Sequence, residues 1–249
     1  MKALILAAGY ATRLYPLTKE FPKPLLEVEK KPIIDYIVEK IEGLSAIDEI
    51  LVVTNSKFVG QFKVWAQARA SSKPIRVIDD LTTSNDDRLG AIGDIHFALQ
   101  DTNLCDDLLV IGGDNLFEDP LHDFLAFAQT HRSAPSIGIY DIQDITHANK
   151  YGVVKLSDDQ RVVDFQEKPA KPQSTLVAMC VYYFPCDKLG LIKEYLTLRQ
   201  GKHDATGFYI DWLRQQVPVY AFLFKGRWYD IGDHAFYHKA NTQFNKGGV

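Results

Sequence analysis

The chain has 249 residues, of which 46% are hydrophobic and 24% are charged, and its formal net charge is −4. This is the balance of a globular protein with a sizeable core, and it argues against general binders of nucleic acid or anionic membranes, which need a basic face. The three cysteines form no CxxC pair, so we expect reduced thiols. The apolar stretches are too short for a signal peptide or a membrane span, and we therefore expect a cytoplasmic protein.

The first half of the chain alternates short apolar segments with longer helical patterns. Segments rich in Val, Ile and Leu predict strands at 2–8, 50–54, 75–79, 108–112 and 136–141. The patterns between them predict helices at 32–43, 57–70, 89–99 and 120–131. Strand and helix in alternation indicate a mostly parallel sheet with helices on both faces.

The second half of the chain changes character. Two segments at 152–156 and 161–167 flank a polar turn and predict a hairpin that walls one side of a pocket. The remaining patterns predict strands at 176–184 and 219–224 and helices at 186–197, 207–216 and 234–244. Because there is no repeat and no linker, we predict one α/β domain over 1–249, with a mixed, mostly parallel central sheet, flanking helices and the inserted hairpin.

A polar loop follows the first strand and carries small, hydroxyl and cationic residues. Ligands of open α/β sheets lie beyond the carboxyl ends of the strands. The small residues Ala8 and Gly9 let backbone N–H groups approach a ligand, and Thr12 adds a hydroxyl. Arg13 and Lys23 add two positive charges, so the loop combines the donors and cations that a triphosphate needs.

The same loop has a second interpretation, as an ordinary strand-to-helix connection with surface charges. It contains neither GxxxxGK[ST] nor GxGxxG, the two common phosphate-binding patterns. Lys23, however, lies between Pro22 and Pro24, which constrain its backbone. A constrained lysine favours a positioned cation.

Two aspartates that are far apart in the sequence each follow an apolar strand. Asp114 lies in a Gly-Asp-Asn run after the strand at 108–112, and Asp230 lies in Trp-Tyr-Asp-Ile-Gly. Two carboxylates beside a phosphate loop suit Mg²⁺, which prefers oxygen ligands and keeps several waters. Roles in turns or helix caps are the alternative, because aspartate is common at both.

A third group of residues belongs to the hairpin and to a later tryptophan. Gly152 opens the first strand of the hairpin, and Glu167 and Lys168 end the second. Glu167 can accept hydrogen bonds from hydroxyls, Lys168 can pair with a phosphate, and Gly152 leaves room for a sugar ring near the backbone. Trp228 would add an apolar wall. The alternatives are that Glu167 and Lys168 form a solvated ion pair and that Trp228 belongs to the core.

The run L-A-A-G-x-x-T-R-L-x-P-x-T-x-x-x-P-K-P-L at 6–25 resembles the N-terminal pattern of the sugar-1-phosphate nucleotidyltransferases. G-D-N, Y-G-V, E-K-P and W-x-D-x-G follow in the order of that family, so the resemblance covers nearly the whole chain. It implies a Rossmann-like, single-domain fold of the short glucose-1-phosphate thymidylyl- or uridylyltransferase type. The nucleotide-binding half would be about 1–133 and the sugar-phosphate-binding half about 134–249.

The resemblance also implies an activity, the transfer of a nucleotidyl group from a nucleoside triphosphate to a sugar 1-phosphate with release of pyrophosphate. For the nucleotide it implies binding by Ala8, Gly9, Thr12, Arg13, Lys23 and Gly90, and catalysis by Arg13, Lys23 and Asp114. For the sugar phosphate and Mg²⁺ it implies Gly152, Glu167, Lys168 and Trp228, with Asp114 and Asp230 holding the metal. No catalytic Ser, Cys or His is required, because the attacking phosphate oxygen is already ionised. Neither nucleic acid nor membrane is an expected partner, and a homo-oligomer is expected from the family.

Residues 81–90 depart from the family pattern, in which a glutamine shortly precedes a glycine-led helix. Gly90 matches that glycine, but no glutamine stands before it, so cytosine and purines stay open beside thymine and uracil. Two other hypotheses remain. One is a cytidylyl- or other nucleotidyltransferase acting on phosphocholine or another phosphomonoester, and the other is a catalytically silent regulatory domain that binds nucleotide sugars. The matched charged residues of the three motifs favour an enzyme, because a silent domain does not need them.

Overall fold

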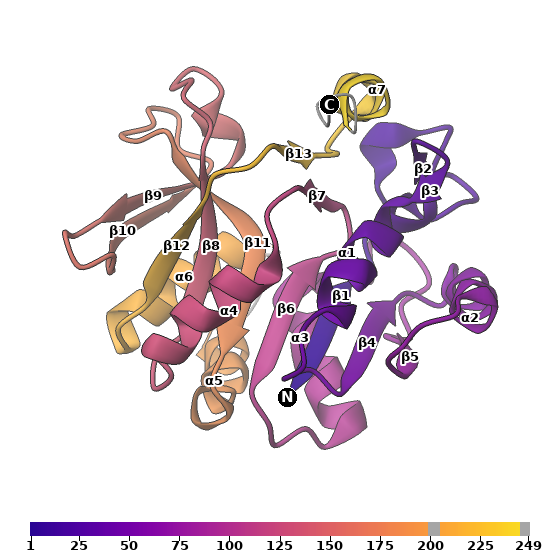
Figure 1. Cartoon of the computed structure of the whole chain (residues 1–249), viewed down its shortest axis with the longest axis horizontal. Coiled ribbons are helices and arrows are strands. Elements are labelled where there is room, and N and C mark those ends of the chain that lie inside the picture. The colour runs from indigo at the N-terminus through magenta and orange to yellow at the C-terminus, as the bar shows by residue number, and fades with distance from the viewer. Residues whose placement is uncertain (199–204, 245–249) are drawn as a thin grey trace.

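A nine-stranded sheet runs through the centre of the molecule (Figure 1). The structure is a computed structural model, and it describes residues 1–198 and 205–244. The strands of the sheet are β1 (Lys2–Leu6), β4 (Glu49–Thr54), β5 (Ile75–Asp79), β6 (Leu108–Gly112), β8 (Ser136–Asp141), β9 (Gly152–Leu156), β10 (Val162–Glu167), β11 (Leu176–Phe184) and β12 (Tyr220–Phe224). The predicted α/β class with a mixed central sheet is confirmed.

The two halves of the sheet differ in strand direction. The order is β10-β9-β11-β6-β1-β4-β5; β8 also pairs with β11, and β12 pairs with β8. In the first half β6, β1, β4 and β5 are all parallel, so their carboxyl ends meet at one edge of the sheet. From β11 onwards the pairing is antiparallel, including the predicted hairpin of β9 and β10, while β12 pairs in parallel with β8.

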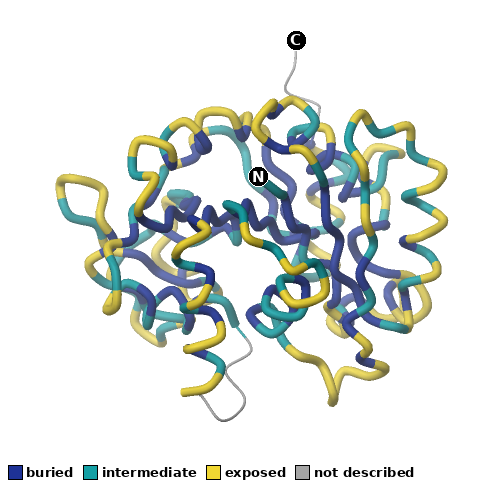
Figure 2. The backbone as a smooth tube through the Cα atoms, turned by 90° about the horizontal axis from the view of Figure 1, so that it is seen from below, coloured by how far each residue is buried: buried dark blue, intermediate teal, exposed yellow. Residues whose placement is uncertain are grey.

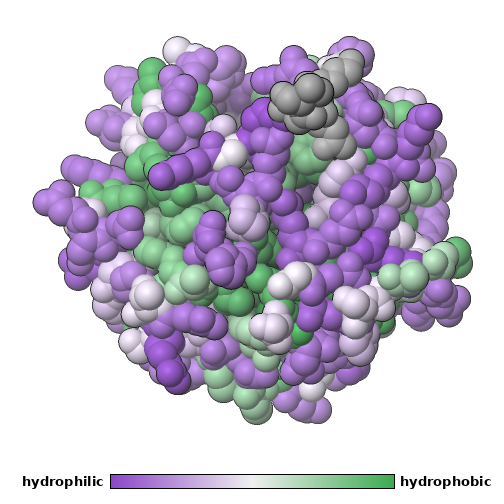
Figure 3. Space-filling view, in the orientation of Figure 1, coloured by the Kyte–Doolittle hydropathy of each residue, from purple (hydrophilic) through white to green (hydrophobic). Residues whose placement is uncertain are grey.

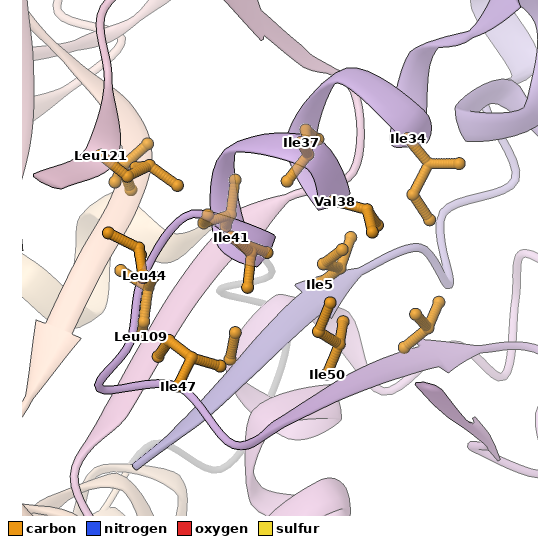
Figure 4. Close-up of a cluster of buried hydrophobic side chains, with 14 of the residues drawn as sticks. Ile5, Ile34, Ile37, Val38, Ile41, Leu44, Ile47, Ile50, Leu109 and Leu121 are labelled. Carbon is orange, nitrogen blue, oxygen red and sulfur yellow. The ribbon is translucent and has the colours of Figure 1, made fainter. Parts of the chain in front are cut away.

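Helices cover both faces of the sheet because successive residues of the buried strands point to opposite sides. Ala3 and Ile5 of β1 pack in one apolar cluster, which also holds residues of α1 (Ile33–Glu42), α2 (Val59–Ala68) and α4 (Leu121–Thr130). Leu4 of β1 packs in the opposite cluster, with residues of α3 (Gly90–Thr102), α5 (Gly190–Leu198) and α6 (Thr206–Gln216). Figure 4 shows how α1 presents its apolar side chains, spaced three and four residues apart, to the first of these clusters.

Short elements bridge the two halves at the carboxyl edge. The strands β7 (Asn115–Phe117) and β13 (Trp228–Asp230) form a small antiparallel sheet, and β2 (Glu27–Val28) pairs with β3 (Lys31–Pro32). The final helix α7 (His234–Gln243) follows β13 and packs on β2 (Figure 1). The Tyr237 hydroxyl donates to the Glu27 carbonyl at 2.7 Å, which ties α7 to the N-terminal half.

The predicted boundaries shift by a few residues at most of the elements. The first strand ends at Leu6 rather than at residue 8, and the helix predicted from residue 186 starts with a separate turn, η4 (Cys186–Lys188). Pro32 and Pro120 occupy the position just before the first helical residue, not the first turn itself. The two short sheets were not predicted. Residues 199–204 and 245–249 of the predicted domain lie outside the described part of the chain.

Burial follows this layered arrangement. Figure 2 shows the buried backbone gathered in the central strands and the exposed backbone in the surrounding turns and outer helix faces. On the face shown in Figure 3, hydrophilic residues predominate, and hydrophobic residues gather over β8, β12 and α4. Among the helices of residues 1–198 and 205–244, none has the length and apolar character to cross a membrane.

Candidate active site

Two polar side chains at the end of the neighbouring strand β4 and just after it hold the loop that follows β1. The Thr54 hydroxyl donates to the Ala7 carbonyl at 3.2 Å, and the Asn55 amide donates to the Ala8 carbonyl at 2.8 Å. Ala8 is buried, whereas Gly9 is exposed and has open space where a side chain would stand. The two hydrogen bonds therefore hold the loop backbone in place, and the exposed Gly9 leaves space for a ligand beside it.

Lys23 follows this loop in a short 3-10 helix, η2 (Lys23–Leu25). Pro22 and Pro24 flank it, and its side chain is 10% exposed, so the lysine is buried despite its charge. Its ammonium donates to Asp114 Oδ2 at 2.6 Å. A buried ammonium with one short carboxylate contact is a positioned charge rather than a solvated one.

The β7–β13 pair brings the two predicted metal carboxylates together. Asp114 lies between β6 and β7, and β13 pairs with β7 so that Asp230 stands opposite Asn115. Burial would raise the pKa of Asp114, but the Lys23 ammonium, together with a backbone hydrogen bond and the charge of Arg13, holds that pKa below its ordinary value. Burial and the charge of Asp114 raise the pKa of Asp230 to about 6.

This electrostatic arrangement fits a divalent cation. The charge of Asp114 acts strongly on Asp230, and a cation between the two carboxylates would relieve that repulsion. Within the described ranges no group of three or more His, Cys, Asp or Glu side chains forms a metal cage. Two carboxylates without a full cage suit Mg²⁺, which retains waters and uses substrate phosphates as further ligands.

A cavity of about 500 Å³ opens beside these carboxylates. The predicted residues that line it are Arg13, Asp114, Gly152, Glu167, Lys168, Trp228 and Asp230. Among the described residues, Ala8, Gly9, Thr12, Lys23 and Gly90 are predicted residues that do not line it. Lys23 acts on the cavity through its contact with Asp114. The hairpin of β9 and β10 forms one wall of the cavity, as predicted.

The buried end of β10 forms a close-packed wall of this cavity. The Glu167 side chain is 9% exposed, and burial raises its pKa although the Lys168 ammonium, 3.5 Å from Oε1, opposes the rise. A Cβ on Gly152 would lie 2.4 Å from the Phe165 ring, and one on Gly207 would lie 1.9 Å from Glu167 Oε2. Both positions therefore require glycine while Glu167 and Phe165 keep their places.

Trp228 is half-buried and belongs to the cavity wall as well as to the edge of the core. Its indole N–H donates to Asn115 Oδ1 at 2.9 Å, and its ring packs against those of Tyr140 and Tyr151 at centroid distances of 5.5 Å. The prediction that Trp228 forms part of the cavity wall and the alternative that it packs in the core are thus each partly correct.

The segment before α3 leads into Gly90, which the sequence analysis predicts as a nucleotide-binding residue. Gly90 is the first residue of α3 and has φ 75°, a conformation that favours glycine, and the next residue, Ala91, lines the cavity. Asp87 fastens the preceding loop, since its carboxylate accepts hydrogen bonds from the backbone N–H groups of Thr83 and Ser84. These bonds lower the pKa of Asp87 to about 2.

Several cavity residues escaped the sequence analysis. Lys150, Cys180, Thr206, Gly207 and Phe236 line the cavity, and none belongs to a motif. Lys150 directly precedes the Tyr-Gly-Val run, which offers a weak signal. The others come from β11, α6 and α7, and only the tertiary structure brings these elements together.

Comparison with known proteins gives a consistent picture. The model of the nucleotidyl transferase family matches residues 2–247. This chain is 29% identical over 235 residues to the bifunctional protein GlmU of Methanocaldococcus jannaschii, covering 93% of this chain and 51% of that protein. It is 30% identical over 246 residues to a Sulfolobus acidocaldarius protein assigned as a mannose-1-phosphate guanyltransferase, covering 98% and 63%. The chain thus spans about half to just under two thirds of the length of these relatives.

Solved structures share the fold. A Bacillus anthracis protein assigned as a glucose-1-phosphate thymidylyltransferase has a TM-score of 0.81 at 23% identity and covers 100% of this chain and 97% of its own. A UDP-glucose pyrophosphorylase complexed with UDP-glucose also has a TM-score of 0.81, at 21% identity, covering 97% of both chains.

Proposed function

Because the chain belongs to the nucleotidyl transferase family, we propose that it transfers a nucleotidyl group from a nucleoside triphosphate to a sugar 1-phosphate and releases pyrophosphate. The observation that carries this proposal is the cluster of Lys23, Asp114 and Asp230 beside a cavity that Gly152, Glu167 and Lys168 line. Family membership supplies the reaction class, and the cluster supplies the charges that the reaction needs.

The reaction is a substitution at phosphorus. An oxygen of the sugar phosphate attacks the α-phosphorus, a new P–O bond forms, and the bond to the bridging oxygen breaks so that pyrophosphate leaves. The nucleophile needs no general base, because the second pKa of a phosphomonoester is about 6. The obstacle is repulsion between two anions, so catalysis consists of neutralising charge and holding the groups in line.

Three cations of this chain would meet that requirement. Arg13 lines the cavity on the side of the glycine loop, and Lys23 stands behind Asp114. We assign both to the triphosphate and the departing pyrophosphate. Lys168 lines the cavity beside Glu167, and we assign it to the phosphate of the acceptor.

Magnesium belongs to this proposal as the cofactor. Asp114 and Asp230 would hold it, and when bound it would offset the negative charge of the reacting phosphates. The backbone at Ala8 and Gly9, with Thr12 and Gly90, would bind the nucleotide on the edge formed by β1, β4 and β5.

The acceptor side favours a polyhydroxylated ring. The carboxylate of Glu167 can accept hydrogen bonds from sugar hydroxyls, and Gly152 and Gly207 keep the space around it clear. Phosphocholine carries no alcohol hydroxyl that could donate such hydrogen bonds. We therefore propose a sugar 1-phosphate rather than phosphocholine as the acceptor.

Pyrophosphate release with Mg²⁺ tests the proposal, using ATP, GTP, CTP, UTP and dTTP against a panel of sugar 1-phosphates and phosphocholine. We expect release that depends on one base and on a sugar 1-phosphate. Lys23→Ala should lower turnover by about 100-fold or more, whereas Lys63→Ala, on the exposed face of α2, should not. If the folded protein binds a triphosphate but no acceptor in the panel leads to release of pyrophosphate, the hypothesis of a silent regulatory domain replaces that of an enzyme.

A further inference from the structure

Asn115 directly follows Asp114, and the protein engages both ends of its side-chain amide. The residue is 3% exposed. Its Oδ1 accepts the indole N–H of Trp228 at 2.9 Å. Its Nδ2 donates to the carbonyls of Met179 and Cys180, the latter at 3.2 Å. An indole only donates and a carbonyl only accepts, so these partners fix the orientation of the amide.

These hydrogen bonds join three elements that are distant in the sequence. Asn115 belongs to β7, its carbonyl partners belong to β11, and Trp228 belongs to β13. Each of the three elements contributes residues to the cavity. Asp230 stands opposite Asn115 in the β7–β13 pair. The amide therefore connects the segments that carry the two carboxylates to the residues of β11 that line the cavity.

The β11 segment that Asn115 holds has an irregular backbone. The pairing of β11 with β8 shifts register between Ala178 and Tyr182. Within this bulge Cys180 has φ 55°, a left-handed conformation that is costly for a residue with a side chain. The carbonyls before and after its α-carbon, those of Met179 and Cys180, both accept from Asn115. The amide thus holds Cys180 in a conformation that the residue would not favour alone.

We propose that Asn115 is a positioning residue for the acceptor. It holds the bulge of β11 and the Trp228 ring at a set distance from Asp114 and Asp230, so that the sugar phosphate reaches the α-phosphate in line. This inference rests on the proposed function for its kinetic consequences. Its structural content, the restraint of Cys180 by Asn115, does not depend on that function.

The first test separates the two substrates. Asn115→Ala should raise the KM for the sugar 1-phosphate by about tenfold or more, because two carbonyls of β11 lose their donor and this part of the cavity wall shifts. The KM for the nucleoside triphosphate should stay close to that of the wild type. Asn55→Ala, which removes the buried amide beneath Ala8, is the mirror control and should shift the triphosphate KM instead. Gln173→Ala, an exposed change, controls for substitution itself.

A second variant distinguishes positioning from a general loss of packing. Glycine adopts a positive φ without strain, so Cys180→Gly should preserve the bulge when the clamp is absent. The double variant Asn115→Ala/Cys180→Gly should therefore recover a large part of the acceptor KM that Asn115→Ala loses. If the double variant is as impaired as the sum of the two single variants, the clamp does not act through the bulge and the proposal is wrong.

The third test needs no catalysis and uses the Cys180 thiol as a probe. In a Cys105→Ser/Cys186→Ser background, alkylation of Cys180 by N-ethylmaleimide should be slow, because Cys180 is half-buried and the bulge of β11 holds it in place. Adding Asn115→Ala should speed alkylation by about tenfold or more as the bulge loosens, and Gln173→Ala should not. An unchanged rate overturns the clamp. Absent pyrophosphate release in the wild type would overturn the proposed function and leave this measurement valid.

Discussion

The proposed nucleotide site and the proposed acceptor site are built in different ways. The first takes its loop and both of its cations from one run of residues at 6–25, which a single parallel strand delivers to the edge of the sheet. The second collects single residues from the hairpin, the bulge of β11, the start of α6 and the short strand β13. The proposed nucleotide site is therefore a contiguous sequence motif, whereas the residues of the proposed acceptor site come together only when the chain folds.

Beside each of these two sites, however, a buried asparagine donates hydrogen bonds that hold the backbone in place. Asn55 is fully buried, donates to the Ala8 carbonyl and accepts from the Phe58 N–H at 3.1 Å. Asn115 likewise donates to a carbonyl of β11 and accepts from the Trp228 indole N–H. A buried amide can satisfy two or three partners at once, so one side chain fixes a loop that has no regular hydrogen bonding of its own.

The largest expected effect lies at the junction of the halves. Asp114→Asn preserves the shape of the side chain but removes the charge that pairs with Lys23 and Mg²⁺, so turnover should fall by about 1000-fold. Steady-state pyrophosphate release measures this loss. Asp101→Asn, which alters an exposed ion pair with Arg76, should leave turnover intact. Turnover in Asp114→Asn within a few-fold of the wild type would contradict the assignment.

A glycine substitution should affect the acceptor half alone. Gly207→Ala would place a Cβ 1.9 Å from Glu167 Oε2, so the carboxylate must move. We expect the KM for the sugar 1-phosphate to rise by about 10-fold to 100-fold, from a clash of about 1–3 kcal/mol. Gly190→Ala, at the start of α5, meets nothing within 4 Å and should be neutral or slightly stabilising. Equal acceptor KM values for the two variants would show that Glu167 does not bind the acceptor.

The nucleotide half should respond to Asn55→Ala. Loss of the hydrogen bond to Ala8 frees the glycine loop, and we expect the KM for the triphosphate to rise by about fivefold to tenfold. The acceptor KM should change little, which is the reverse of Asn115→Ala. Titration calorimetry with the triphosphate alone gives the same comparison without turnover. If both KM values rise together, the two halves are not independent.

The smallest effect concerns stability and pH. Burial raises the pKa of Glu167 above its ordinary value of 4.5, so the folded protein binds this proton more tightly than the unfolded chain does. That contribution is present at acidic pH and disappears as the pH rises through the raised pKa. Glu167→Gln should therefore gain stability relative to the wild type as the pH rises from acidic to neutral. Urea unfolding across a series of buffers measures the difference, and a gain that shrinks with rising pH would contradict the assigned shift.

The sequence was sufficient for the fold and for the contiguous motif. Apolar segments such as 108–112 and 136–141 contain enough Val, Ile and Leu to mark buried strands whatever their partners. The three-residue strands β7 and β13 carry no such signal, because their pairing across the chain defines them. The proximity of Asp114 and Asp230 depends on that pairing, and from the residues alone it could only be inferred from their shared type.

The role of Asn115 could not be inferred from its neighbours. An asparagine after an aspartate is an ordinary turn residue until β11 and Trp228 are placed around it. The same holds for Gly207, which resembles any glycine near a helix start until Glu167 lies against it. The roles assigned to site residues, the homo-oligomer and the cytoplasmic location stay predictions.

The central claim is that the cavity brings the α-phosphate of a triphosphate on one half to a sugar phosphate on the other. Incubation with an α-³²P-labelled triphosphate, Mg²⁺ and the preferred sugar 1-phosphate tests it most directly. We predict that the label appears in a nucleotide sugar and that the pyrophosphate released is unlabelled. Label that remains in the triphosphate, or that appears only as free nucleoside monophosphate, would contradict the transfer.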